Sequence, residues 1–385
     1  MNRHSLGAIA GIAELKSVRR TQGATTLQFI AQAVLRAVED AGLDKDAIDG
    51  LLVGPQVGET PQHVPATVAE YLGIEPRMSN VVDLGGASGA GMVWRAAAAI
   101  EAGMCEAVVC VLANVREEVA PRSPNRNPIR EFDVPFGASG ANISYALPMQ
   151  RHMAEFGSTP AQFARIASIE RQNAQRNPDS IFYGHPASVE EVLASPVIAS
   201  PLHLFEIVMP VAGGCALVVT SAQRARTLRH PPVHLLGAGE KITHRAISQM
   251  PVLTSGPLGP AMHQALARTG LSARDVSLFS LYDCYTIMVA LTMEDAGLCG
   301  RGQFGHWMDE HRFGHDGDFP LNTHGGQLGC GQADLAGGMA HIVEAVRQLR
   351  HAAGDRQIAN AQTALVTGNG ATVSEAVALV LGADA

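Results

Sequence analysis

Two stretches of the chain, 228 residues apart, share one pattern: AVLRAVEDAGLDKDAIDGLLV (Ala33–Val53) and AMHQALARTGLSARDVSLFSL (Ala261–Leu281). In each stretch, apolar residues at helical spacing precede a Gly-Leu pair, and a short apolar run follows. This pattern predicts a helix that ends at a glycine, followed by a buried strand. Because the pattern recurs at one offset, it indicates a duplicated α/β unit.

The rest of the sequence predicts further helices and strands. The spacing of apolar residues predicts a helix over Gln28–Ala41 that ends at Gly42. A small-residue helix is expected over Gly86–Ala102 and an amphipathic helix from Pro160 to Gln175. Short apolar runs predict strands at Leu6–Ala13, Ile48–Val53, Ala107–Ala113, Val276–Leu281 and Thr363–Thr367. The alternation of strands and helices favours a mostly parallel sheet with helices packed on it.

The repeat also suggests how the chain is divided. We expect an N-terminal half made of residues 1–114 and 211–230, and a C-terminal half made of residues 231–385. Residues 115–210 would form an inserted cap, lid or dimerisation segment. Two similar halves would place a site where their matching loops meet.

Composition excludes several classes of protein. Of the 385 residues, 46% are hydrophobic, which is enough for a large core and excludes intrinsic disorder. The net charge of −8 and the absence of a basic run make nucleic acid an improbable partner. No apolar run reaches the length of a membrane span. Leu6–Ala13 is better explained as a strand than as a signal peptide, because Glu14 and Lys16 close it.

The six cysteines form no CxxC pair, so we expect no structural zinc site and no bound metal. Without an export signal the thiols should stay reduced, which favours a cytoplasmic protein.

The first candidate for chemistry is VDLGGASGAG (82–91), a glycine-rich turn that opens a helix. Backbone N–H groups at Gly86, Ala87 and Ser88 could hold an oxyanion. Close packing of a buried helix would explain the same glycines. The run lacks the GxSxG pattern, so Ser88 is a weak candidate nucleophile.

Two loops in the second half carry further candidates. SLYDCYT (280–286) holds two of the five tyrosines, and Tyr282 could transfer a proton, although a core role would explain the cluster too. LNTHGGQLGCGQ (321–332) places His324 on a loop beside Gly325. Cys330 lies near the start of the next helix, where a thiol pKa can be lowered, although an inert buried cysteine is the alternative. A last loop, VTGNGAT (366–372), could bring Gly368 and Asn369 to the same site or be simply a turn.

Together these loops resemble the thiolase superfamily, and most closely its sterol-carrier-protein-X-type and lipid-transfer-protein-like group. The resemblance covers nearly the whole chain, and its most specific part is NTHGGQLG (322–329) with EAVRQLR (344–350). Tyr282-Asp-Cys-Tyr285 matches the His-Asp-Cys-Phe motif of that group. The resemblance implies an α/β protein with the duplicated, five-layered αβαβα thiolase fold, commonly a homodimer that acts on acyl-CoA.

The chain departs from thiolases at two positions. Gly86 stands where the nucleophilic cysteine of thiolases is expected, and Gln332 stands where their Gly-His-Pro motif has its histidine. Thiolysis needs both an acyl-cysteine and its base. The resemblance therefore implies that ordinary thiolase chemistry has been lost.

The steroid side-chain aldolases, one branch of this superfamily, resemble the chain in having Leu-Tyr-Asp and NTHGGQLG. The resemblance implies retro-aldol cleavage of a β-hydroxyacyl-CoA, with coenzyme A as part of the substrate and no bound cofactor. It also implies a small partner protein with a zinc ribbon and an OB-fold. Tyr282 matches the first tyrosine of a catalytic pair. The second tyrosine has no equivalent here, because the region after Gly329 keeps the thiolase length and puts Gln332 near its place.

Three hypotheses follow for function. In a lyase, Tyr282 would transfer protons and His324 would be a base or enolate donor. Gln332 and the turn at Gly86 would hold the thioester oxygen, with Asp283, Gly325, Gly368 and Asn369 around the substrate. A non-catalytic acyl-CoA-binding subunit is the second hypothesis. The third is a residual acyltransferase with Ser88 or Cys330 as nucleophile.

Overall fold

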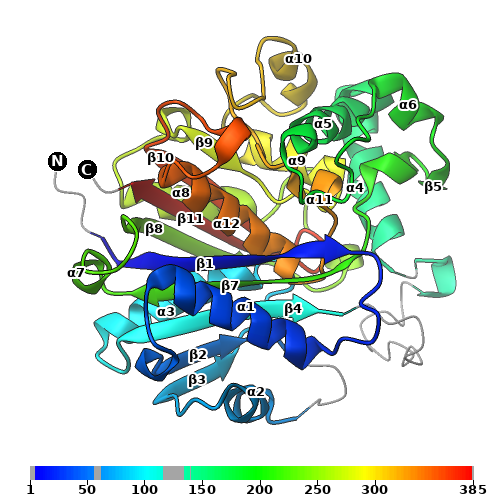
Figure 1. The fold of residues 1–385 in the computed structure, drawn as a ribbon. Coiled ribbons are helices and arrows are strands. Elements are labelled where there is room, and N and C mark those ends of the chain that lie inside the picture. The colour runs from blue at the N-terminus through cyan, green and yellow to red at the C-terminus, as the bar shows by residue number, and fades with distance from the viewer. Residues whose placement is uncertain (1–4, 56–61, 116–133, 139, 384–385) are drawn as a thin grey trace.

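The computed structural model describes residues 5–55, 62–115, 134–138 and 140–383, and its centre is one large sheet. Nine strands lie in the order β3-β2-β4-β7-β1-β8-β11-β10-β9 (Figure 1). A separate pair, β5 and β6, lies in the inserted segment. The strands are β1 (Gly7–Val18), β2 (Gly50–Val53), β3 (Met78–Val81), β4 (Ala107–Asn114), β5 (Val197–Ala199), β6 (Leu202–His203), β7 (Ala212–Thr220), β8 (Val233–Ile242), β9 (Leu278–Ser280), β10 (Thr363–Gly370) and β11 (Glu375–Ala383).

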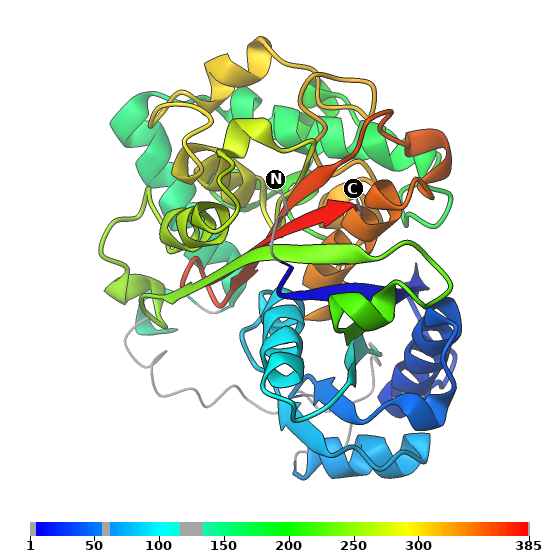
Figure 2. The same ribbon diagram turned by 90° about the vertical axis from the view of Figure 1, so that its left-hand side faces the viewer.

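Helices cover this sheet in layers. The α-helices are α1 (Thr26–Ala41), α2 (Val64–Leu72), α3 (Ser88–Glu101), α4 (Ala141–Phe156), α5 (Pro160–Asn173), α6 (Val189–Ala194), α7 (Ala222–Ala225), α8 (Leu258–Ala267), α9 (Thr286–Asp295), α10 (Phe304–Asp309), α11 (Gly326–Cys330) and α12 (Ala336–Leu349). Helices α3 and α12 pack on each other between the two halves of the sheet, while α1 and α8 cover the outer faces (Figure 2). These are the five αβαβα layers that the resemblance predicted.

The two halves of the sheet have the same strand pattern. In the first half β2 is parallel to β4, and β4, β7 and β1 follow as antiparallel neighbours. In the second half β9 is parallel to β10, and β10, β11 and β8 follow in the same way. The antiparallel pair β1 and β8 joins the halves. The repeated sequence thus corresponds to a repeated topology.

The expectation of a mostly parallel sheet was wrong. Only three of the eight neighbouring strand pairs described in the large sheet are parallel. A short turn joins β10 directly to β11, and a hairpin connection of this kind makes antiparallel neighbours. The alternation of strands and helices holds only for the first part of each half.

Most of the predicted elements are confirmed. Helix α1 begins at a capping box of Thr25 and Gln28 and ends at Gly42, which has a left-handed φ of 71°. The strand expected at Leu6–Ala13 is β1, and the helix expected from Pro160 is α5.

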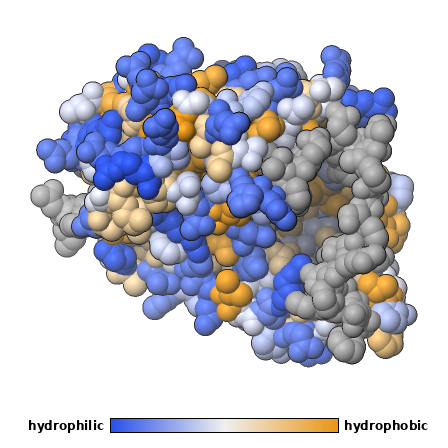
Figure 3. Space-filling model, turned by 90° about the horizontal axis from the view of Figure 1, so that it is seen from below, coloured by the Kyte–Doolittle hydropathy of each residue, from blue (hydrophilic) through white to orange (hydrophobic). Residues whose placement is uncertain are grey.

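The inserted segment packs on the second half of the molecule. Helices α4 and α5 contact α9, and their buried side chains Tyr145 and Phe163 share one hydrophobic cluster with Leu281 and Tyr282. On the face shown in Figure 3, apolar residues are dispersed among hydrophilic ones. Among the described residues, no helix is both long and apolar enough to cross a membrane.

Close contact between β1 and α1 gives a first prediction. A Cβ atom on Gly11 would lie 2.2 Å from the carbonyl oxygen of Ala37 in α1. We expect Gly11→Ala to lower the free energy of unfolding by about 1–3 kcal/mol, because the helix must move off the sheet. Urea denaturation measures this. Gly300→Ala is the matched control, since only ordinary contact surrounds Gly300, and an equal loss there would contradict the packing argument.

Candidate active site

The glycine turn before α3 is closed by its own hydrogen bonds. The hydroxyl of Ser88 accepts the N–H of Leu84 at 2.9 Å, and Ser88 is fully buried. The N–H groups of Ala87 and Ser88 donate to the carbonyl oxygens of Leu84 and Gly85, each at 3.0 Å. These two N–H groups are therefore engaged and do not form the oxyanion hole that the sequence suggested. Ser88 closes the turn.

The aromatic ring of Tyr282 lies where a side chain on Gly86 would be. An added Cβ at residue 86 would be 2.0 Å from the Tyr282 hydroxyl oxygen and 2.3 Å from its Cζ. Gly338 in α12 approaches from the other side, because a Cβ there would lie 1.9 Å from the Gly86 carbonyl oxygen. Glycine at both positions lets the tyrosine reach the point where α3 and α12 meet.

Two hydrogen bonds fix Tyr282. Its hydroxyl oxygen accepts a hydrogen bond from Gln332 Nε2 at 2.9 Å, and its backbone N–H donates to Thr367 Oγ1 at 3.0 Å. Burial, followed by the nearby Cys284 and Asp283, raises the pKa of Tyr282 well above its usual range. The phenol therefore keeps its proton at neutral pH. Since Gln332 fills an acceptor position, that proton remains free for donation.

Asp283 organises the neighbouring loop. Its carboxylate accepts the N–H groups of Gln327 and Leu328 in α11 and the Nε2 of His341, all at 2.9 Å. Although burial alone would raise the pKa of Asp283, these bonds and one from Glu170 hold it well below the usual range. The sequence placed Asp283 beside the substrate. In the structure its oxygens are engaged within the protein.

His324 lies beyond His341, with the two ring centroids 5.2 Å apart. It is buried, and neither ring nitrogen has a hydrogen-bond partner among the described residues. Burial lowers the pKa of His324 to about 3. A neutral imidazole of this kind is a weak base but can still donate a hydrogen bond. Gly325 next to it has a φ of 106° and packs against Ala174, where any Cβ would clash.

Cys330 differs from the expectation of an activated thiol. It ends the short helix α11 instead of opening the next helix, and its Sγ donates to the carbonyl oxygen of His324 at 3.2 Å. Burial raises the pKa of Cys330, in the direction opposite to activation. Burial likewise raises the pKa of Cys284. Both thiols are therefore protonated.

The C-terminal glycine loop meets the turn at Gly86. A Cβ on Gly368 would be 2.7 Å from Ala87 Cα, so the two backbones are in contact. Asn369 is buried, and its Nδ2 donates to the hydroxyl oxygen of Tyr145 at 2.8 Å. Tyr145 also stacks on Tyr285, with ring centroids 4.1 Å apart. The structure thus brings Tyr282, Gln332, Gly86 and Gly368 together, with Asn369 on the same strand as Thr367.

Sequence reasoning missed several residues of this cluster: Tyr145, Glu170, Thr367 and His341. Glu170 lies on the apolar face of α5 and is buried, and burial raises its pKa well above the usual range. A charged residue on an apolar helix face was the available signal. Tyr145 had a signal too, since the chain has only five tyrosines.

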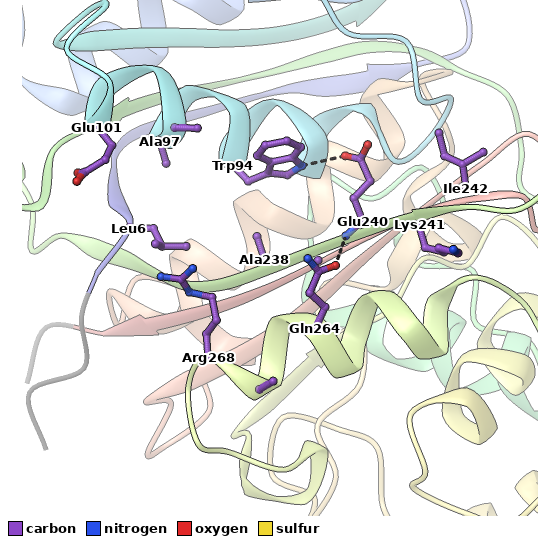
Figure 4. A pocket seen from close by; sticks show the side chains of 13 residues that line it. Leu6, Trp94, Ala97, Glu101, Ala238, Glu240, Lys241, Ile242, Gln264 and Arg268 are labelled. Atoms are coloured by element: carbon purple, nitrogen blue, oxygen red, sulfur yellow. Dashed lines mark hydrogen bonds between the residues drawn. The ribbon is translucent and has the colours of Figure 1, made fainter.

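The large groove in Figure 4 is separate from this cluster. It has a volume of about 1140 Å³ and is lined by residues of α3, β8 and α8. Its walls are tied by hydrogen bonds from Trp94 to Glu240 and from the Glu240 N–H to Gln264. None of the residues that the sequence predicted for the site lines this groove.

Comparisons with known proteins agree with this architecture. A family model described as "Thiolase C-terminal domain-like" matches residues 239–383. The chain is 34% identical to a steroid side-chain-cleaving aldolase of Thermomonospora curvata, over 98% of both chains. It is 32% identical to a 17-hydroxy-3-oxo-4-pregnene-20-carboxyl-CoA lyase of Mycobacterium tuberculosis, over 89% of this chain and 91% of the relative. A solved structure, described as "Ltp2-ChsH2(DUF35) aldolase", superposes with a TM-score of 0.89 at 32% identity, over 98% of both chains.

The contact between Gly86 and Tyr282 predicts a coupled pair. Gly86→Ala should lower the free energy of unfolding by about 1–3 kcal/mol, because the new methyl group displaces the ring. In a Tyr282→Leu background, which lacks the ring, the same change should cost less than about 0.5 kcal/mol. A double-mutant cycle by urea denaturation measures the coupling. Additive effects would show that the two residues do not compete for space.

The buried His324 predicts a pH dependence of stability. Because its folded pKa is about 3 and its unfolded pKa is near 6.5, acid protonates the unfolded chain first and favours unfolding. Between pH 7 and pH 5 this residue should remove about 2 kcal/mol of stability. The His324→Gln variant should therefore lose about 2 kcal/mol less of its free energy of unfolding than the wild type between pH 7 and pH 5. Urea denaturation at the two pH values measures this. The exposed His306→Gln is the control, and identical pH profiles for all three proteins would refute the assignment.

Proposed function

The chain belongs to the thiolase superfamily, and two of its relatives there are named for aldolase and lyase activity. We therefore propose that it cleaves a β-hydroxyacyl-CoA by a retro-aldol reaction. The observation that carries this proposal is the position of the Tyr282 ring. It fills the space beside Gly86, where a nucleophilic side chain would otherwise stand. A phenol that keeps its proton suits proton transfer and not covalent catalysis.

The proton balance of a retro-aldol reaction fits one phenol. The β-hydroxyl group loses a proton, the Cα–Cβ bond breaks, and the electron pair of that bond forms an enolate with the thioester. Protonation at Cα then completes the acyl-CoA product beside an aldehyde or ketone. Because Tyr282 starts protonated, it can take the hydroxyl proton only as it gives its own proton to Cα, so the two transfers occur together as the Cα–Cβ bond breaks. Gln332 would hold the tyrosine oxygen in place during this exchange.

The buried neutral His324 suits a hydrogen-bond donor to the enolate oxygen better than a base, because its pKa is low. Transfer of an acyl group to the protein has less support. Cys330 and Cys284 are held as thiols, and the hydroxyl of Ser88 is engaged in its own turn. The alternative is a non-catalytic acyl-CoA-binding subunit, and activity measurements distinguish it from a lyase.

We also propose that the chain works as a homodimer with a small partner protein in the cytoplasm. The similar solved structure is named as a complex with a DUF35 protein, so a zinc-ribbon and OB-fold protein is the partner to test. Strand β3 is an edge strand, and its residues Ser79, Asn80 and Val81 are exposed. An exposed edge of this kind can pair with a second chain. Coenzyme A would enter as part of the substrate, without a further cofactor.

Tyr282→Phe tests the proposal directly. We expect the wild type to convert β-hydroxyacyl-CoA to acyl-CoA and a carbonyl product without free CoA, and the variant to lose at least about 100-fold in kcat. Mass spectrometry of the products, with and without the candidate partner, measures both. Tyr183→Phe is the control, because that tyrosine is exposed.

Three other results would contradict the proposal. Cleavage of β-ketoacyl-CoA with consumption of free CoA would indicate a thiolase. Turnover by Tyr282→Phe close to the wild-type level would remove this residue from the mechanism. Binding of acyl-CoA without turnover, with and without the partner, would favour the binding subunit.

A further inference from the structure

The contact between Tyr145 and Asn369 fixes which end of the asparagine amide faces the tyrosine. The Tyr145 hydroxyl donates to the carbonyl oxygen of Ala371 at 3.1 Å, and a carbonyl oxygen can only accept. The single phenolic proton is therefore used there. What faces Asn369 is a lone pair, so the amide must present its Nδ2 to Tyr145, at 2.8 Å.

The other end of the same amide is left as a buried acceptor. Asn369 is 1% exposed, and its Oδ1 has no hydrogen-bond partner among the described residues. A buried acceptor without a donor is costly, so native structures seldom keep one without a reason. Rotation of the amide would bring Oδ1 against Tyr145, and the phenolic proton would then have to leave the Ala371 carbonyl oxygen.

This acceptor belongs to the cluster around Tyr282. Asn369 lies on β10 between Gly368, which contacts Ala87, and Gly370, where a Cβ would lie 2.0 Å from the Leu84 carbonyl oxygen. Thr367 of the same strand accepts the N–H of Tyr282. Tyr145 and Tyr282 belong to the same buried hydrophobic cluster.

We propose that Tyr145 and Asn369 form a selection unit in which the Asn369 Oδ1 accepts a hydrogen bond from the β-hydroxyl group of the bound substrate and disfavours a β-ketone. This inference rests on the proposed function, and it states that the site distinguishes a β-hydroxyl group from a β-ketone. Asn369 would be the binding residue, and Tyr145 a positioning residue that fixes the amide. A β-hydroxyl donates a hydrogen bond to Oδ1, whereas a ketone places a second acceptor against it.

Several contacts hold Tyr145 in place for this role. Its ring stacks on Tyr285, whose own hydroxyl donates to Asn142 at 2.6 Å. Two turns further along α4, buried His152 contacts the Glu294 carboxylate in α9 at 3.1 Å. These contacts fasten α4 to α9 at two points. A rigid acceptor discriminates more strongly than one that can turn away.

Equilibrium binding tests this without depending on turnover. In a Tyr282→Phe background, which keeps the substrate intact, isothermal titration calorimetry gives Kd for a matched β-hydroxyacyl-CoA and β-ketoacyl-CoA. We expect the hydroxy compound to bind at least about tenfold more tightly. Adding Asn369→Leu should bring the ratio close to one. Adding Tyr145→Phe frees the amide to rotate, so the ratio should fall and the ketone should bind more tightly than before.

The gain in ketone affinity in the Tyr145→Phe variant separates positioning from a general loss of structure, which would weaken both ligands. Tyr71→Phe, at an exposed position on α2, is the matched control and should leave the ratio unchanged. Equal affinities in the parent, a ratio unaffected by both substitutions, or no binding of either compound would overturn the inference. A selective ratio in a wild type that cleaves nothing would instead overturn the lyase proposal and leave the selection unit in place.

Discussion

The buried carboxylate of Asp283 is the interaction on which the site depends. A charge removed from water needs several hydrogen bonds, and Asp283 receives them from α11 and from His341 in α12. Since Tyr282 precedes Asp283 in the sequence, the hydrogen bonds to Asp283 also fix the backbone position of Tyr282. The same carboxylate meets Glu170 of the inserted segment, so it ties together three parts of the chain that are distant in sequence.

Space at the meeting point of α3 and α12 decides which chemistry is available. Gly86 and Gly338 let the two helices approach and admit one aromatic ring between them. A nucleophilic side chain at residue 86 and the ring of Tyr282 would need the same volume. The position of the tyrosine ring and the absence of a side chain at residue 86 therefore depend on each other, and a side chain added at residue 86 alone would clash with the ring.

The sequence predicted what depends on local pattern. The end of α1 at Gly42 follows from helical spacing and a glycine, and the repeat at Ala33 and Ala261 predicted the duplicated topology. Strand direction was missed because hairpins such as β10–β11 are not visible in apolar runs. The state of Cys330 was missed because a pKa depends on burial, and burial depends on the whole fold. Tyr145 was missed because α4 is remote in sequence from the loops that it covers.

Most of the buried titratable groups around Tyr282 are neutral. Burial keeps protons on Tyr282, Tyr145 and Glu170, and it keeps His324 neutral. The charged carboxylates nearby, Asp283 and Glu344, are each held by several hydrogen bonds within the protein. Neutral donors in a low-dielectric setting can stabilise an enolate that forms during a reaction without requiring a fixed positive charge beforehand. Such a site is adapted to moving protons and sharing hydrogen bonds, and this is the physical reason to expect bond cleavage here without a covalent intermediate.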